Sequence, residues 1–264
     1  MKTLLIVNVG QAPQAQLEKF GDFEEWALRA IRSQGVEQHD IHIEFHDGVQ
    51  HDIHIEFHDG VQHDIHIEFH DGVQHALPNF DTLAGVIIMG SLAMASEKKP
   101  WMLRLSDEIV QLVERQIPLL GICFGHQLIA QALGGVVGYH PQGLEIGTVQ
   151  IAKEPAANDD AIFAHLPEQF GAQAVHYQSV LTLPESAVHL ARSDFEPHHA
   201  YRVGSACWGV QFHPEFTPEI MQMSLDGLKH EFEDDYPAKS AQVTETEQAK
   251  QVLLQFARVC CQAQ

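Results

Sequence analysis

A cysteine between two glycines is the part of this sequence best suited to covalent chemistry. It lies in Gly121-Ile-Cys-Phe-Gly125, after an apolar run over residues 117–120 and before a helical pattern. A cysteine on such a tight strand-to-helix turn is expected to expose its sulfur. The N-terminus of the following helix, together with a nearby histidine, would favour the reactive thiolate. Cys123 is therefore the candidate nucleophile.

A histidine and a glutamate two positions apart follow a second apolar run. They end the segment Val210-Gln-Phe-His-Pro-Glu215. In an extended chain, residues i and i+2 point to the same side, so the two side chains are expected to meet. His213 would deprotonate the thiol and later protonate the leaving amine, while Glu215 would orient the imidazole. Together with Cys123 they predict acyl transfer through a thioester.

Backbone N–H groups could stabilise the oxyanion that forms in such a reaction. Phe124 directly follows the nucleophile, so its N–H is one expected donor. A second donor is expected from the Gly90-Ser91 turn, which ends a buried apolar stretch. The other cysteines are interpreted as small buried hydrophobic residues. These are Cys207, Cys260 and Cys261.

Strands and helices alternate over the first half of the chain. The patterns predict strands over residues 3–9, 85–89 and 117–122, and helices over 16–33, 100–115 and 125–133. This order predicts an α/β fold with a mostly parallel central sheet flanked by helices. Ligands of such sheets bind at the carboxyl ends of the strands, where Gly90 and Cys123 fall.

The second half is richer in short strands. Strands are expected around 136, 148–152, 174–176, 189–191, 200–203 and 208–212, and some should form a small antiparallel extension. Thr217-Pro218 predicts the start of a helix that reaches about residue 230. We expect one domain over residues 1–230. An acidic linker and a C-terminal amphipathic helix follow over 231–264.

Residues 38–73 are three identical copies of a twelve-residue unit that begins at Gln38, Gln50 and Gln62. Apolar and polar residues alternate within the unit before an Asp-Gly pair, so each copy predicts a strand and a turn. Complete identity suggests a recent or engineered duplication, with one copy belonging to the ancestral fold. A stacked solenoid and a histidine-rich metal site are weaker interpretations than a solvated strand face.

Composition limits the classes of function. The 264 residues carry a formal net charge of −21, which argues against affinity for nucleic acid or for an anionic membrane surface. The four cysteines show neither a disulfide framework nor paired zinc spacing, so we expect no metal, no cofactor and a cytoplasmic location. No segment is apolar enough over eighteen or so residues to predict a membrane helix.

The two motifs resemble those of the class I glutamine amidotransferases, which carry G-x-C-x-G-x-Q and a later F-H-P-E. The similarity runs through residues 119–128 and 208–215, and Gly85-Val-Ile-Ile-Met-Gly90 and His176-Tyr-Gln-Ser179 have counterparts in standalone, GMP-synthase-like members. The resemblance implies a flavodoxin-like fold and hydrolysis of the glutamine side-chain amide through a thioester on Cys123. Where many members have Gly-Gly-Pro, this chain has Gly90-Ser91-Leu92.

By the same resemblance, Gln127 would help to bind glutamine, and Tyr177, Gln178 and Ser179 would contact its amino-acid end. No ammonia-consuming domain or phosphate-binding glycine loop is evident in the sequence, so a separate synthase subunit is the expected partner. Two alternatives stay open. One is a γ-glutamyl peptide hydrolase or transferase that uses the same three residues, and the other is a non-catalytic binding or regulatory module. The duplicated strands also predict altered self-association.

Overall fold

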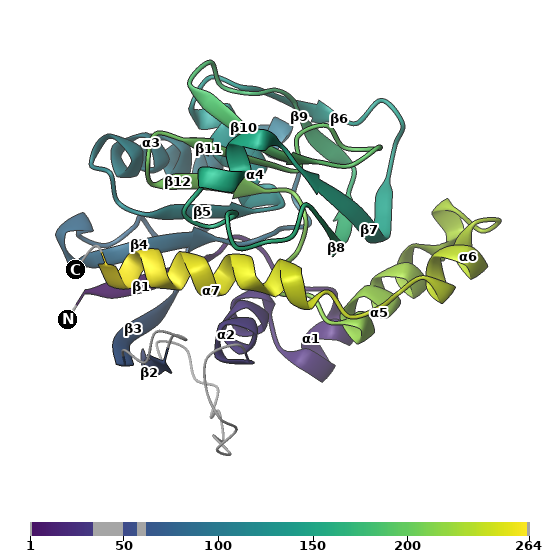
Figure 1. Cartoon of the computed structure of the whole chain (residues 1–264), viewed down its shortest axis with the longest axis horizontal. Coiled ribbons are helices and arrows are strands. Elements are labelled where there is room, and N and C mark those ends of the chain that lie inside the picture. Colours follow the sequence, from purple (N-terminus) through teal and green to yellow (C-terminus); the bar gives the residue numbers. More distant parts are fainter. Residues whose placement is uncertain (1, 34–49, 57–61, 263–264) are drawn as a thin grey trace.

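The structure is a computed structural model, and it describes residues 2–33, 50–56 and 62–262 (Figure 1). Its largest sheet has the strand order β2-β3-β1-β4-β5-β12-β11-β10-β7-β8. The core of this sheet is parallel, as predicted: β1 (Thr3–Asn8) pairs with β4 (Leu83–Ile88), which pairs with β5 (Leu119–Ile122) and then β12 (Cys207–Val210). The mixed α/β class predicted from the alternating patterns is confirmed.

On the β12 side, four further strands of this sheet run antiparallel to their neighbours. They are β11 (Ala200–Val203), β10 (Ala187–Arg192), β7 (Glu145–Lys153) and β8 (Gln169–His176). A separate two-stranded sheet joins β6 (Val136–Tyr139) to β9 (Gln178–Thr182). The sequence patterns did not predict β9, whose residues follow β8 after only Tyr177.

Helices cover both faces of the sheet, because alternate strand residues point to opposite sides. On one face, Leu4 and Ile6 of β1 share a core with α2 (Phe23–Ser33), α5 (Pro218–Leu228) and α7 (Glu247–Gln262). On the other face, Leu5 and Val7 pack with α3 (Pro100–Glu114) and α4 (Phe124–Ala132). In Figure 1 the yellow helix α7 crosses the sheet alongside α2, so the C-terminal helix shares the main core.

Two helix predictions need correction. The single helix expected over residues 16–33 is two helices, α1 (Gln14–Phe20) and α2, because Gly21 adopts φ 75° and ends the first. The segment interpreted as a solvated linker contains α6 (Tyr236–Ala241). None of the helices in the described part of the chain is long and apolar enough to cross a membrane.

The third repeat copy provides the strand of the fold. β3 (Gln62–Asp71) pairs in parallel with β1, and Ile67 is fully buried against the core. The second copy, β2 (Gln50–Glu56), pairs antiparallel with β3 and lies at the end of the strand order. The first copy lies outside the described residues. Two identical sequences therefore occupy an internal position and an end position in the same sheet.

Candidate active site

Cys123 lies on a strained turn between β5 and α4. Its φ is 50°, one of three positive values among non-glycine residues in the described chain. The flanking glycines permit this turn, because a Cβ on Gly121 would lie 2.4 Å from the backbone of Gly125, and a Cβ on Gly125 would lie 2.2 Å from the Ile88 carbonyl oxygen. The glycine pattern thus allows the close packing that holds Cys123 in place.

His213 reaches the cysteine because β12 is the parallel neighbour of β5. Val210 lies opposite Ile122, and the N–H of Cys123 donates a 2.8 Å hydrogen bond to the Val210 carbonyl. Beyond β12 the chain bends, and the His213 N–H donates to the Gln173 carbonyl at 2.8 Å. Cys123 and His213 therefore leave the same edge of the sheet, as expected.

Glu215 lies beside the His213 ring, with Nδ1 and Oε1 2.7 Å apart. The contact was predicted, but its reason was wrong, because residues 214 and 215 form a turn and not an extended strand. Both side chains are buried. Burial alone would lower the pKa of His213, but the charges of Glu215 and then Cys123 raise it to about 10. This environment favours an imidazolium ring.

Gly90 and Cys123 both pack against the His213 ring. A Cβ on Gly90 would lie 3.1 Å from His213 Cε1 and 3.8 Å from Cys123 Cβ. The ring also packs on Phe216, with ring centroids 4.1 Å apart. His213 Nε2 is buried and forms no hydrogen bond within the described residues. Cys123 Sγ is 3.8 Å from the Val175 carbonyl oxygen, to which the thiol can donate.

Ser91 occupies its turn without strain, since it is absent from the positive-φ residues of the described chain. Its hydroxyl donates to the Val9 carbonyl at 2.8 Å and accepts from the Ala93 N–H at 3.1 Å. The Ser91 side chain therefore anchors the turn, and the backbone of Gly90 and Ser91 stays beside Cys123. Phe124 begins α4, so its N–H has no carbonyl partner within the helix. Phe124 follows Cys123 in the chain, and Gly90 lies beside Cys123 in space. Both expected oxyanion donors are therefore close to Cys123.

A cavity of about 400 Å³ opens in front of the sulfur. Its polar lining includes Cys123, Gln127, His176, Tyr177 and His213. Most of the rest of the lining is apolar. Among these side chains are Phe23, Met94, Phe124, Phe216, Met223 and Leu228, contributed largely by α2, α4, α5 and their neighbouring loops.

The expected substrate-binding residues take different positions. Gln127 and Tyr177 line the cavity, whereas Gln178 and Ser179 are buried away from it. The Gln178 side chain bonds to Ser96 at 2.6 Å, and the Ser179 hydroxyl donates to Glu196. Gln127 Nε2 donates to the Gln178 carbonyl at 2.6 Å and to Gln211 at 3.0 Å. The backbone of Gln178 therefore supports the wall of the site by holding Gln127.

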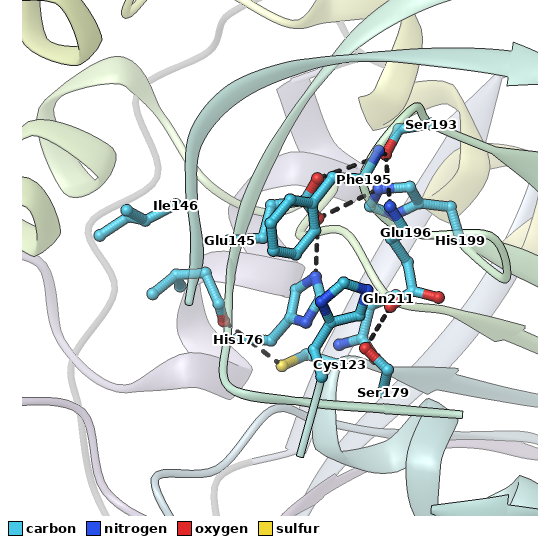
Figure 2. Close-up of polar contacts among 12 residues, drawn as sticks. Cys123, Glu145, Ile146, His176, Ser179, Ser193, Phe195, Glu196, His199 and Gln211 are labelled. Carbon is cyan, nitrogen blue, oxygen red and sulfur yellow. Dashed lines mark hydrogen bonds and ion pairs between the residues drawn. The ribbon is translucent and has the colours of Figure 1, made fainter. Parts of the chain in front are cut away.

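Sequence reasoning missed a buried polar cluster behind this wall. Glu145, at the start of β7, faces His176 of β8, His199 and Ser193 (Figure 2). The only sequence signal was a carboxylate between the apolar residues Leu144 and Ile146, which is unusual on a solvated strand.

Comparison with known proteins identifies the family. Residues 42–227 match the family model described as "Glutamine amidotransferase class-I". The chain belongs to the class I glutamine amidotransferases. Its fold also resembles a crystal structure of a glutamine amidotransferase from Thermotoga maritima, with a TM-score of 0.67 over 98% of this chain and 99% of that one, at 18% identity.

Two kinds of curated protein are among the relatives of this chain. γ-Glutamyl peptidase 4 of Arabidopsis thaliana is 35% identical over 144 residues, which are 54% of this chain and 57% of the relative. A subunit of the glutamine-hydrolyzing GMP synthase of Methanopyrus kandleri is 34% identical over 123 residues, which are 44% of this chain and 64% of the relative. The matched part therefore spans about three fifths of the length of these relatives.

Proposed function

We propose that this chain hydrolyses a γ-glutamyl amide through a thioester on Cys123, with glutamine as the simplest substrate and glutamate and ammonia as the products. The observation that carries the proposal is the packing of Cys123 and Gly90 beside the His213–Glu215 pair, with Cys123 and His213 lining one cavity. A strained thiol, a buried base with an orienting carboxylate and free helix N–H groups are the parts that acyl transfer uses.

The chemistry follows from these positions. The Cys123 thiolate attacks the amide carbon, and the resulting oxyanion lies near the N–H groups of Phe124 and the Gly90-Ser91 turn. The His213 imidazolium donates its proton to the leaving nitrogen as the C–N bond breaks, leaving a thioester. His213 then takes a proton from water, which attacks the thioester and releases glutamate, and the thiolate is restored. Glu215 stabilises the charged ring in both steps.

A glutaminase assay that detects ammonia tests this proposal. The wild type should release ammonia and glutamate in equal amounts. Cys123→Ser and His213→Ala should each lower kcat by roughly 10⁴-fold or more, because a nucleophile and its base act as a unit. Wild-type turnover that persists in Cys123→Ser would exclude the thioester route.

A second candidate is a γ-glutamyl peptide hydrolase, and the cavity favours it. Cavities of about 300–1,000 Å³ usually accommodate drug-sized ligands, so about 400 Å³ exceeds what free glutamine needs. The apolar lining from α2 and α5 offers a place for a larger amine portion. A kcat/KM at least about tenfold higher for γ-glutamyl-phenylalanine than for glutamine would select this candidate, since one buried apolar group contributes roughly 1.5–3 kcal/mol.

For the first candidate, we infer that the ammonia acceptor is a separate synthase subunit. This inference is supported by relatives that are themselves named as single subunits of GMP synthase. If adding an extract that contains the partner increases ammonia release, the synthase subunit also activates this chain. We also retain the expectation of one amidotransferase domain over 1–230, with 231–264 as its C-terminal extension.

A further inference from the structure

A second histidine–carboxylate pair lies beside the cavity, separate from His213 and Glu215. Glu145 Oε2 is 2.7 Å from His176 Nε2, and both side chains are almost fully buried. His199 Nε2 approaches the same oxygen at 3.2 Å, close enough for an ion pair but not aligned for a hydrogen bond. Ser193 Oγ donates to the other oxygen at 3.3 Å. The described residues in this cluster form no three-ligand metal site.

Hydrogen bonding determines the charge of this pair. His176 Nδ1 is 3.1 Å from the carbonyl oxygen of Gln178, which can only accept. Burial would raise the pKa of Glu145, but its contacts with His176 and His199 hold that pKa well below its usual range, so this side chain is a carboxylate. Since both partners of the His176 ring are acceptors, the ring satisfies both only when each nitrogen carries a proton.

The His176 end of this pair adjoins the substrate cavity. His176 lines the cavity and Glu145 does not. In the view of Figure 2, the His176 ring lies between Glu145 and the Cys123 sulfur. Among the described residues that line the cavity there is no Lys, Arg, Asp or Glu. His213 is paired with Glu215, and in the proposed reaction it transfers the proton. His176 is therefore the remaining cationic side chain for an anionic ligand.

His176 also positions the wall next to the nucleophile. The carbonyl of Val175 faces Cys123 Sγ, and the carbonyl of Gln178 accepts from both His176 and Gln127. One buried ring thus fixes the segment that lies between the sulfur and α4. The titratable groups that interact with this ring are Glu145 on β7, His199 before β11 and His126 on α4.

We propose that Glu145 and His176 form a buried ion pair whose positive end binds the α-carboxylate of the γ-glutamyl substrate through its electric field and holds residues 175–178 in place. His176 acts here as a binding and positioning residue, with no part in bond breaking. The inference rests on the proposed function for the identity of the ligand. It adds a charge-specific role for two residues outside the Cys123, His213 and Glu215 set.

Glu145→Gln tests this charge directly. A glutamine amide can donate to His176 Nε2, so a neutral ring would keep both hydrogen bonds while the charge is lost. Binding is measured calorimetrically in the full chain with Cys123→Ala, which prevents turnover. The added Glu145→Gln change should raise the Kd of L-glutamine or γ-glutamyl-phenylalanine at least about tenfold. The Kd of 4-aminobutanamide, which is glutamine without its α-carboxylate, should change less than about twofold.

A matched control is Glu154→Gln, the same chemical change at the surface pair with Arg192, and it should leave each Kd unchanged. Equal weakening of both ligand types by Glu145→Gln, no weakening, or no binding of either γ-glutamyl ligand would overturn the proposal. If Glu145→Gln does not fold, ¹⁵N-histidine spectra of the wild type decide. The His176 ring should carry two protons at neutral pH, and a ring with one proton would overturn the ion pair.

These experiments separate the two proposals. Binding that depends on Glu145 and on the α-carboxylate, found in a chain whose wild type shows no turnover, would support the ion pair and exclude the proposed hydrolysis. Turnover in the wild type, with ligand binding that does not depend on Glu145 or on the α-carboxylate, would support the proposed hydrolysis and exclude the ion pair.

Discussion

Gly90 lies so close to His213 that one methyl group would disturb the ring, because a Cβ at position 90 would be 3.1 Å from His213 Cε1. This contact is shorter than ordinary van der Waals separation, so the ring would have to move by a few tenths of an ångström. The same Cβ would lie 3.8 Å from Cys123 Cβ. Glycine at position 90 therefore leaves room for the His213 ring beside Cys123.

Gly90→Ala should lower kcat/KM roughly 10- to 100-fold, because small displacements of catalytic groups are costly. Thermal stability should change little, since the tight contact of the added methyl is with a side chain and not with backbone. Gly171→Ala is the control, because its new Cβ would make only ordinary contacts at 3.7–3.8 Å. Steady-state kinetics and thermal melts of both variants check the prediction, and equal activities would contradict it.

Glu215→Gln should shift the pH dependence of activity. Burial opposes the charge of His213, but Glu215 and Cys123 raise its pKa to about 10, so the proton-donating ring persists at alkaline pH and is lost as the pH rises through that value. Removing the charge of Glu215 should move the alkaline limb of kcat/KM to lower pH. The fold-loss of activity in Glu215→Gln should be roughly 100 times smaller than the fold-loss in Cys123→Ser. If the alkaline limb of kcat/KM lies at the same pH in Glu215→Gln and in the wild type, the electrostatic role of Glu215 is contradicted.

Glu145 should contribute to stability against acid. Its pKa is depressed in the folded chain, so the stabilisation is present above its ordinary pKa of 4.5 and is lost as the pH falls below that value. The free energy of unfolding of the wild type should therefore fall more steeply than that of Glu145→Gln below pH 4.5. Urea unfolding across this pH range measures the difference, and parallel curves would contradict the assignment.

Deleting residues 38–61 should preserve the fold and its activity. The deletion leaves the third copy, which supplies β3, and removes β2 from the end of the strand order. Loop closure depends only weakly on length, so stability should change by about 1 kcal/mol or less. Self-association should decrease, because an added edge strand can pair between chains. Size-exclusion chromatography and melting curves test this, and identical elution and stability would count against an effect of the repeat on association.

The positions of the proposed catalytic residues were predictable because their signals are local. Gly121 and Gly125 mark the close packing around Cys123, and an apolar strand precedes each motif. Parallel strands place their carboxyl ends at one edge, so the meeting of Cys123 and His213 follows from topology. Whether Ser91 could replace a glycine was not predictable, since that depends on a backbone angle.

The buried cluster was beyond the reach of the sequence patterns. Glu145 and His176 are 31 positions apart, and their contact depends on the register between β7 and β8, in which the two residues are paired. The break at Gly21 was hidden because apolar residues continue at helical spacing on both sides of it. The repeat copies cannot be told apart by sequence, so only tertiary pairing identifies the third as β3.

The central claim is that Cys123 is a nucleophile activated by His213, and intact-mass analysis tests it most directly. The chain is incubated with a diazoketone analogue of glutamine, which traps such a thiolate covalently. We predict one adduct on Cys123 that is absent in Cys123→Ala and slowed in His213→Ala, while the three other cysteines stay unmodified. No adduct in the wild type at any pH tested, or equal labelling in His213→Ala, would contradict the account.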